Sequence, residues 1–276
     1  MNLLVKLGEV NVETLKTVGI VAGIIAGIAL VLVIAILLIG KFFKVDVDEK
    51  VTNILNNLAG ANCGGCGCSG CSAFAAKLAD GTAELSDCHV TSPECKAEIA
   101  KILGVTFTAS EPTVAVVKCN GGNENAHNAF EYKGNKTCAA CNTLLGGNKM
   151  CKTACLGCGD CASVCPEKAI SVIGGVAKVK PERCISCGTC IRTCPKHIIE
   201  RIPVSAPVYV ACSSHCPGKE VRQQCKVGCI GCGICAKNCP HGAITMVDNL
   251  PVFDYSKCTG CMTCVEKCPR KIILAR

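Results

Sequence analysis

The sequence predicts an α+β protein with a single N-terminal transmembrane helix, in which cysteines rather than large apolar side chains organise the rest of the chain. Cysteine fills 29 of the 276 positions, Trp is absent and aromatic residues make up only 3%. So few rings leave little material for a conventional core. Two further observations are a long uncharged stretch near the N-terminus and a cysteine pattern that occurs four times.

The uncharged stretch comprises the 24 residues from Thr17 to Gly40 and is flanked by lysines. As a helix it would extend about 36 Å, enough to span the hydrocarbon core of a bilayer. A secretory signal peptide is the alternative, but its apolar region is shorter and no small-x-small cleavage site precedes Lys41. We therefore expect residues 1–44 to be a membrane anchor, with the helix at about 17–40.

The thiols predict the orientation of the anchor, because lysines at both ends of the helix give only a weak positive-inside bias. Clusters of unpaired cysteines need a reducing compartment, which also argues against a disulfide scaffold. We expect a single-pass protein of the cell (inner) membrane whose large C-terminal part faces the cytoplasm.

Residues 45–104 should form a small domain around four cysteines. Apolar residues at helical spacing, followed by glycines, predict short helices over 45–60, 72–80 and 94–104, and we expect Lys41–Gly60 to act as a hinge. The cysteines are separated by two, four and sixteen residues: Cys63, Cys66, Cys71 and Cys88. Three close ligands and one remote ligand suit a single [4Fe–4S] cluster. Cys68, inside the loop, is interpreted as a spectator.

Internal repetition organises the remainder of the chain. One cysteine pattern occurs twice at a separation of 29 positions, and this pair returns 74 positions later: residues 155–165, 184–194, 229–239 and 258–268. The segments that lead into the two pairs also match, because VAVVKC and VYVAC precede CKTAC and CKVGC. The first of these segments predicts a strand over 113–119. We therefore expect two copies of one module, at 105–204 and 205–276.

Each repeat has the form C-x2-C-x2-C-x3-C-P, which is the bacterial 2[4Fe–4S] ferredoxin signature. Three close cysteines wrap three corners of one cubane, and the fourth ligates the cubane of the partner repeat. An Ala-Ile or Ile-Ile pair after each Cys-Pro should pack over each cluster. Zinc sites normally separate two C-x2-C pairs by a dozen or more residues, so this spacing argues against zinc. The crossing predicts four ligand sets: Cys155, Cys158, Cys161 and Cys194; Cys184, Cys187, Cys190 and Cys165; Cys229, Cys232, Cys235 and Cys268; Cys258, Cys261, Cys264 and Cys239.

The lead-in segments hold further cysteines. The first has four, and they predict a sixth cluster: Cys119, Cys138, Cys141 and Cys151. The second has only Cys212, Cys216 and Cys225, which we interpret as buried thiols left from the duplication. A seventh cluster there would need a ligand from Cys95, Cys68, His215 or another chain. The sequence thus predicts at least five [4Fe–4S] clusters, six with the Cys119 set and seven if the second lead-in also binds one.

No nucleotide or substrate site is predicted, since no Walker loop, G-x-G-x-x-G or nucleophile elbow occurs. The formal net charge of +8 counts every cysteine as neutral, and six bound clusters would change it to about −4. Without a Lys/Arg stripe, nucleic acid is excluded as a partner. The chain should conduct electrons and have no substrate-transforming active site of its own.

The order of these features resembles the B subunit of the Rnf complexes, which are ion-translocating ferredoxin:NAD oxidoreductases. The resemblance rests on the anchor, then CGGCGCSGC with Cys88, then VAVVKC, then the CLGCGDC and CIGCGIC units. It covers nearly the whole chain and matches the longer, clostridial-type form with two ferredoxin modules. It implies twenty cysteine ligands for five clusters and also carries over the Cys119 set, whereas Cys68 and Cys216 have no assigned place.

The resemblance further implies a role in a translocase. The protein would accept electrons from soluble reduced ferredoxin and pass them to membrane and flavin-bearing Rnf subunits, where flow to NAD drives Na⁺ or H⁺ export. One alternative is a stand-alone membrane-anchored polyferredoxin that serves a hydrogenase or dehydrogenase and purifies without such partners. The other is a non-redox structural or iron-sensing role, with clusters that are not reversibly reduced at low potential.

Overall fold

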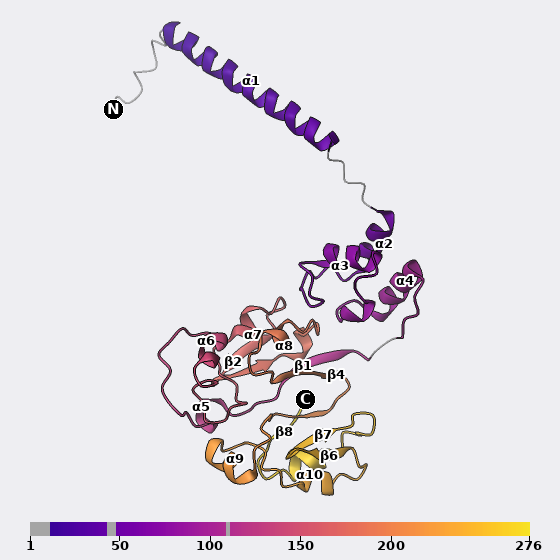
Figure 1. Ribbon diagram of the computed structural model, residues 1–276, viewed down its shortest axis with the longest axis vertical. Coiled ribbons are helices and arrows are strands. Elements are labelled where there is room, and N and C mark those ends of the chain that lie inside the picture. The colour runs from indigo at the N-terminus through magenta and orange to yellow at the C-terminus, as the bar shows by residue number, and fades with distance from the viewer. Residues whose placement is uncertain (1–11, 43–47, 109–110) are drawn as a thin grey trace, which may run out of the picture. The chain divides into compact units, whose positions relative to one another are not determined.

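The computed structural model describes residues 12–42, 48–108 and 111–276, and the chain divides into two units, Met1–Asp48 and Glu49–Arg276. The described part of the first unit is helix α1 (Val12–Phe42), drawn in indigo in Figure 1. Its segment Lys16–Leu38 is 23 residues long and apolar enough to cross a membrane. The side chains of this segment are exposed almost throughout, as expected for a helix that lipid would cover.

The second unit begins with a small helical domain. Its core is formed by Ile54, Phe74, Leu78 and Ile99, all nearly inaccessible to solvent. An N-cap residue defines the start of its last helix, because the Ser92 Oγ accepts a hydrogen bond from the Cys95 N–H at 3.3 Å. The elements are α2 (Glu49–Asn57), α3 (Cys71–Ala79), η1 (Leu85–Asp87) and α4 (Pro93–Leu103).

The predicted helices of this domain are therefore present, each shifted by a few residues at its ends. Helix α2 also occupies part of the segment predicted as a hinge, and its Ile54 packs in the domain core. Of that segment, residues 43–47 lie outside the described residues.

The remainder consists of two modules built from two-stranded antiparallel sheets (Figure 1). In each module the strand before the lead-in pairs with the strand after the second cysteine repeat, and a hairpin lies between the two repeats. The first module contains β1 (Thr113–Val117), α5 (Gly122–Asn125), α6 (Cys138–Thr143), α7 (Asp160–Ser163), β2 (Ile170–Ile173), β3 (Val176–Val179), η2 (Pro181–Arg183), α8 (Thr189–Thr193) and β4 (Ile199–Pro203). The second contains β5 (Val208–Val210), α9 (Gly218–Gln224), α10 (Ile234–Lys237), β6 (Ile244–Val247), β7 (Leu250–Phe253), α11 (Thr263–Glu266) and β8 (Ile273–Ala275).

The duplication extends to individual backbone hydrogen bonds. The Lys118 N–H donates to the Ile198 carbonyl at 2.7 Å, and the Ala211 N–H donates to the Ile272 carbonyl at 2.8 Å. Both bonds continue the strand pairing just beyond β1 and β5. The strand predicted over 113–119 is thus two residues shorter than expected, because the chain leaves the sheet at Lys118 to enter the lead-in.

Cysteines form a large part of each module core. The core of the first module includes Cys119, Cys155, Cys161 and Cys190 among its buried residues. The core of the second module has a similar share of cysteines: Cys212, Cys229, Cys235 and Cys264. The apolar pairs predicted to pack over the clusters are all buried: Ala169 and Ile170, Ile198 and Ile199, Ala243 and Ile244, Ile272 and Ile273. Both cores therefore centre on thiols with small aliphatic side chains around them.

Candidate iron–sulfur sites

One tight turn after each Cys-Pro directs the fourth cysteine of every repeat. The third residue after the cysteine has a positive φ, and its N–H donates to the cysteine carbonyl at 3.1–3.3 Å: Lys168, His197, Gly242 and Lys271. The turn brings the Ala169 N–H to the Cys165 Sγ and the Ala243 N–H to the Cys239 Sγ, each at 3.3 Å. A backbone donor is thus aimed at the sulfur of Cys165 and of Cys239, where it would stabilise a thiolate.

Two of the predicted crossed sets each surround one cavity. Cys165, Cys184, Cys187 and Cys190 line a cavity of about 350 Å³ in the first module. A cavity of about 340 Å³ in the second module is lined by Cys239, Cys258, Cys261 and Cys264. In both, three thiols come from one repeat and the fourth from its partner.

The remaining crossed set of the first module contains an additional thiol. Cys155, Cys161 and Cys194 line a cavity of about 350 Å³ whose fourth cysteine is Cys138, from the lead-in. Cys158 lies beside Cys138, and burial together with the neighbouring thiolates raises the pKa of Cys158 to about 12. Five thiols therefore gather at this site.

The last crossed set lies in the second module and is also brought together. Burial first, and then the charges of Cys229, Cys232 and Cys268, raise the pKa of Cys235 to about 11. Cys232 is exposed, as is Cys261 of the neighbouring set. The two sites of this module therefore both reach solvent.

The Cys63 loop, residues 63–70 before α3, lies against the second repeat of the first module. The Thr189 hydroxyl donates to the Cys63 carbonyl at 3.1 Å, and Arg192 donates to the carbonyls of Gly64 and Gly65 at 2.7 and 2.5 Å. Burial, and then the charges of the Cys187 and Cys88 thiolates, raise the pKa of Cys63. Cys66, Cys71 and Cys88 pack against the helical core, as does Cys68.

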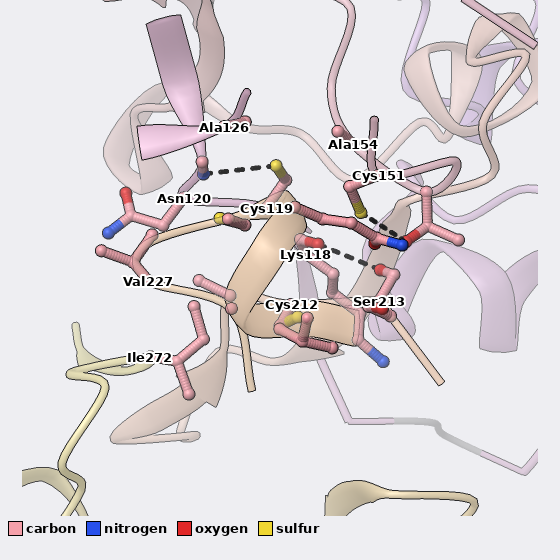
Figure 2. A pocket seen from close by; sticks show the side chains of 18 residues that line it. Lys118, Cys119, Asn120, Ala126, Cys151, Ala154, Cys212, Ser213, Val227 and Ile272 are labelled. Atoms are coloured by element: carbon pink, nitrogen blue, oxygen red, sulfur yellow. Dashed lines mark hydrogen bonds between the residues drawn. The ribbon is translucent and has the colours of Figure 1, made fainter. Parts of the chain in front are cut away.

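The structure divides the predicted Cys119 set between two places. Cys119 and Cys151 line a cavity of about 380 Å³ together with Cys212 and Cys225 of the second lead-in (Figure 2). Cys138 instead lies at the first ferredoxin site. The reason is Asp160, whose carboxylate accepts hydrogen bonds from the Cys138 and Ala139 N–H groups at 2.8 and 3.0 Å and so holds α6 against α7.

Sequence reasoning did not foresee this grouping, although a signal was present. Cys151 and Cys225 both stand in a C-K-x-x-C segment, and Cys119 and Cys212 both follow the first strand of a module. The match between the lead-ins therefore identifies two corresponding pairs of cysteines. At this cavity each lead-in supplies two of the four cysteines.

The thiols suit clusters better than single ions. All 29 cysteines lie in the described residues and none forms a disulfide. In these same residues, no three His, Cys, Asp or Glu side chains are placed to hold one metal ion. A cubane differs from an ion because each of its ligands binds a different iron, so its thiols stand further apart.

Family comparisons assign the same regions to iron–sulfur binding. Residues 58–90 match a family described as a putative Fe-S cluster, and residues 154–198 and 228–272 match the 4Fe-4S dicluster domain. The first match spans the four-cysteine region, and the other two each span one pair of repeats. The protein is thus a mixed helix–strand chain with an N-terminal apolar helix, an Fe–S region and two 4Fe–4S dicluster domains.

Three relatives match 88% of this chain. The B subunit of the Na(+)-translocating ferredoxin:NAD(+) oxidoreductase complex of Acetobacterium woodii is 41% identical over 246 residues, 74% of its length. The B subunit of the ion-translocating oxidoreductase complex of Methanosarcina acetivorans is 37% identical, with 91% of its length covered. The B subunit of the proton-translocating ferredoxin:NAD(+) oxidoreductase complex of Clostridium ljungdahlii is 38% identical, with 87% covered. This chain therefore belongs to the family of B subunits of Rnf-type ion-translocating oxidoreductase complexes.

Proposed function

We propose that the protein is the membrane-anchored iron–sulfur subunit of an Rnf-type complex, which accepts electrons from reduced ferredoxin and relays them to the membrane and flavin-bearing subunits. The observation that carries this proposal is the gathering of the crossed cysteines around cavities of similar size. A bound [4Fe–4S] cluster supplies one-electron transfer at low potential. The protein contributes the thiolate ligands, the hydrogen bonds to sulfur and the exclusion of water.

The proposal assigns twenty cysteines to five [4Fe–4S] clusters. The four crossed sets serve the two ferredoxin modules at 105–204 and 205–276. Cys63, Cys66, Cys71 and Cys88 serve the domain at 45–104, which follows the anchor at 1–44. The donor set fits the group, because thiolate sulfur is the usual ligand of such clusters.

Exposure and contacts suggest a direction for the relay. Cys232 and Cys261 of the second module are exposed, so soluble ferredoxin can approach these two sites closely. The Cys63 loop contacts Thr189 and Arg192 of the first module, and it belongs to the domain that follows the membrane helix in the chain. We place electron input at the second module and output at the Cys63 domain.

Free thiols in this number also support a cytoplasmic location for residues 45–276, because a reducing compartment keeps them available for clusters. Cysteine labelling of the two ends of α1 in intact cells would test this orientation. Labelling of the N-terminal end from outside is expected. Labelling of the C-terminal end from outside would contradict the proposal.

The main experiment is reduction of the anaerobically purified protein by reduced ferredoxin, followed by electron paramagnetic resonance. Reversible reduction at low potential is expected, together with co-purification of polytopic, flavin-bearing subunits. Clusters that do not accept electrons from ferredoxin would contradict the proposal. Reduction without any co-purifying membrane partner would favour the stand-alone polyferredoxin instead.

A further inference from the structure

The cavity between the two lead-ins resembles the ferredoxin cavities in size and in lining. Its empty space, including the part open to solvent, is about 380 Å³, against about 340 to 350 Å³ for the three cavities at ferredoxin repeats. Like each of them it is lined by four cysteines, here Cys119, Cys151, Cys212 and Cys225. Yet no ferredoxin repeat contributes to it.

The four thiols are related by the duplication. Cys119 Sγ accepts a hydrogen bond from the Cys155 N–H at 3.4 Å, and Cys212 Sγ accepts the corresponding bond from the Cys229 N–H, also at 3.4 Å. Cys151 and Cys225 each stand four residues before those donors. Each module therefore contributes an equivalent pair of cysteines, and the two pairs face one cavity.

Direct hydrogen bonds between the lead-ins hold the pairs in place. The His127 N–H donates to the Gln224 carbonyl at 3.0 Å, and the Lys226 N–H donates to the Asn125 carbonyl at 2.8 Å. The Ser213 hydroxyl donates to the Lys118 carbonyl at 3.0 Å, as Figure 2 shows. These bonds lie directly beside Cys119, Cys212 and Cys225, so the thiols occupy a built junction between the modules.

The surroundings suit a group that carries negative charge. The Gly121 N–H donates to the Cys119 Sγ at 3.4 Å, and a Cβ at Gly121 would lie 3.5 Å from the Cys225 Sγ. Lys149, two residues before Cys151, is 2% exposed, and its Nζ donates to the Gly122 carbonyl at 2.8 Å and to the Asn123 Oδ1 at 3.3 Å. A backbone donor thus faces the Cys119 sulfur, and a buried lysine lies two residues from Cys151.

We propose that Cys119, Cys151, Cys212 and Cys225 together bind a sixth [4Fe–4S] cluster, which joins the two ferredoxin modules. The inference rests on the proposed iron–sulfur function and replaces the ligand set expected from the first lead-in alone. A single zinc ion is disfavoured, because the described thiols do not converge on one ion position.

The position of this site links the modules electronically. Cys155 and Cys229, whose N–H groups donate to Cys119 and Cys212, are themselves ligands proposed for one ferredoxin cluster in each module. Cys119, Cys151, Cys212 and Cys225 would hold a cluster beside the sites of Cys155 and Cys229, and with clusters bound it would supply a one-electron step between the modules, each donor being oxidised and each acceptor reduced by one electron.

The test is iron and acid-labile sulfide per chain in the full-length protein, purified without oxygen. About 24 of each are expected for six clusters, against about 20 for five. Cys225→Ala and Cys212→Ala should each lose about four iron and four sulfide. The matched control is Cys216→Ala, which removes a cysteine of the same lead-in that does not line the cavity and should lose none.

A second control separates the two ligand sets. Cys141→Ala should keep all its iron if the junction set is right, whereas the set predicted from the first lead-in requires a loss of about four. Circular dichroism identifies any variant that fails to fold. If either Cys225→Ala or Cys212→Ala fails to fold, the iron content of the other variant tests the inference.

Several outcomes would overturn the inference. They are a wild-type content of about 20 iron, full iron in both junction variants, or loss of zinc in place of iron and sulfide. A wild-type protein with about 20 reducible iron atoms would refute the junction cluster alone. A protein with little iron would refute the proposed function as well.

Discussion

The two ferredoxin modules share their backbone and differ in what surrounds it. The segment from the first lead-in cysteine to the first repeat spans 36 positions in the first module and 17 in the second. The longer segment carries α5 and α6 with Cys138 and Cys141, while the shorter one carries α9 with Cys216 just before it. Duplication thus preserved the strands and turns that aim the thiols, and the difference lies in the covering segments.

This difference changes the exposure of corresponding thiols. Cys187 is buried in the first module, whereas Cys261, its counterpart 74 positions later, is exposed. Cys158 is partly buried beside Cys138, and its counterpart Cys232 is exposed. One module is therefore enclosed by other parts of the chain, and the other presents its sites to solvent. Similar repeats therefore hold corresponding thiols in the interior in one module and at the surface in the other.

Removal of all iron should have the largest effect on folding, and it should destabilise both ferredoxin modules alike. Their cores contain buried cysteines that the clusters would crosslink, whereas no cysteine is among the fully buried residues of the helical domain. We expect anaerobic chelation to unfold 105–276 and to leave α1–α4 helical. Limited proteolysis with circular dichroism measures this. Protease resistance of the iron-free modules would contradict the expected dependence.

A smaller effect, on iron content, should distinguish the two ferredoxin modules. Cys232→Ala should lose about four iron per chain, because the second module has no spare thiol at that site. Cys158→Ala should lose much less, since Cys138 already lines the same cavity and can replace it as the fourth ligand.

The double variant Cys138→Ala/Cys158→Ala should then lose about four iron per chain, as Cys232→Ala does. Equal losses of iron in Cys158→Ala and Cys232→Ala would show that the additional thiol has no such role.

The smallest effect concerns the contact of the Cys63 loop. Arg192 donates to the Gly64 carbonyl at 2.7 Å, and the corresponding residue of the second module is Glu266, which cannot donate in this way. Arg192→Glu should weaken the contact by about 1 kcal/mol, since the guanidinium is exposed and water competes for these carbonyls.

Hydrogen exchange of the amides in the Cys63 loop measures this change. Exchange should be about fivefold faster in Arg192→Glu, with the iron content unchanged. Glu266→Arg is the matched control and should leave exchange in the loop as it is. Unaltered exchange in Arg192→Glu would mean that other contacts hold the loop.

Local patterns accounted for most of the architecture. The helices of the first domain follow from apolar spacing and from caps such as Ser92 and Gly104. The crossed ligand sets follow from the reach of a short repeat, and the structure brings those thiols together. Such features depend on residues close in sequence or related by a visible repeat.

The junction between the lead-ins could not be derived in the same way. Cys119 and Cys225 line one cavity where two separate segments pair through Asn125 and Gln224, and spacing within one segment carries no information about that pairing. Likewise, the position of Cys138 at the first ferredoxin site, away from Cys119 and Cys151, depends on Asp160, a single carboxylate that caps α6. Long-range contacts made by few residues leave no periodic trace in a sequence.

A cluster shared between the lead-ins would also set an order of maturation. Ribosomes make the chain from the N-terminus, and domains generally fold as units during synthesis. Every ligand proposed for the first module has been made once Cys194 emerges, so that module can acquire its clusters early. The junction has only Cys119 and Cys151 until Cys212 and Cys225 follow. Completion of the proposed junction cluster would therefore report that both modules are present and correctly joined, and a truncated chain would be left with two of its four thiols.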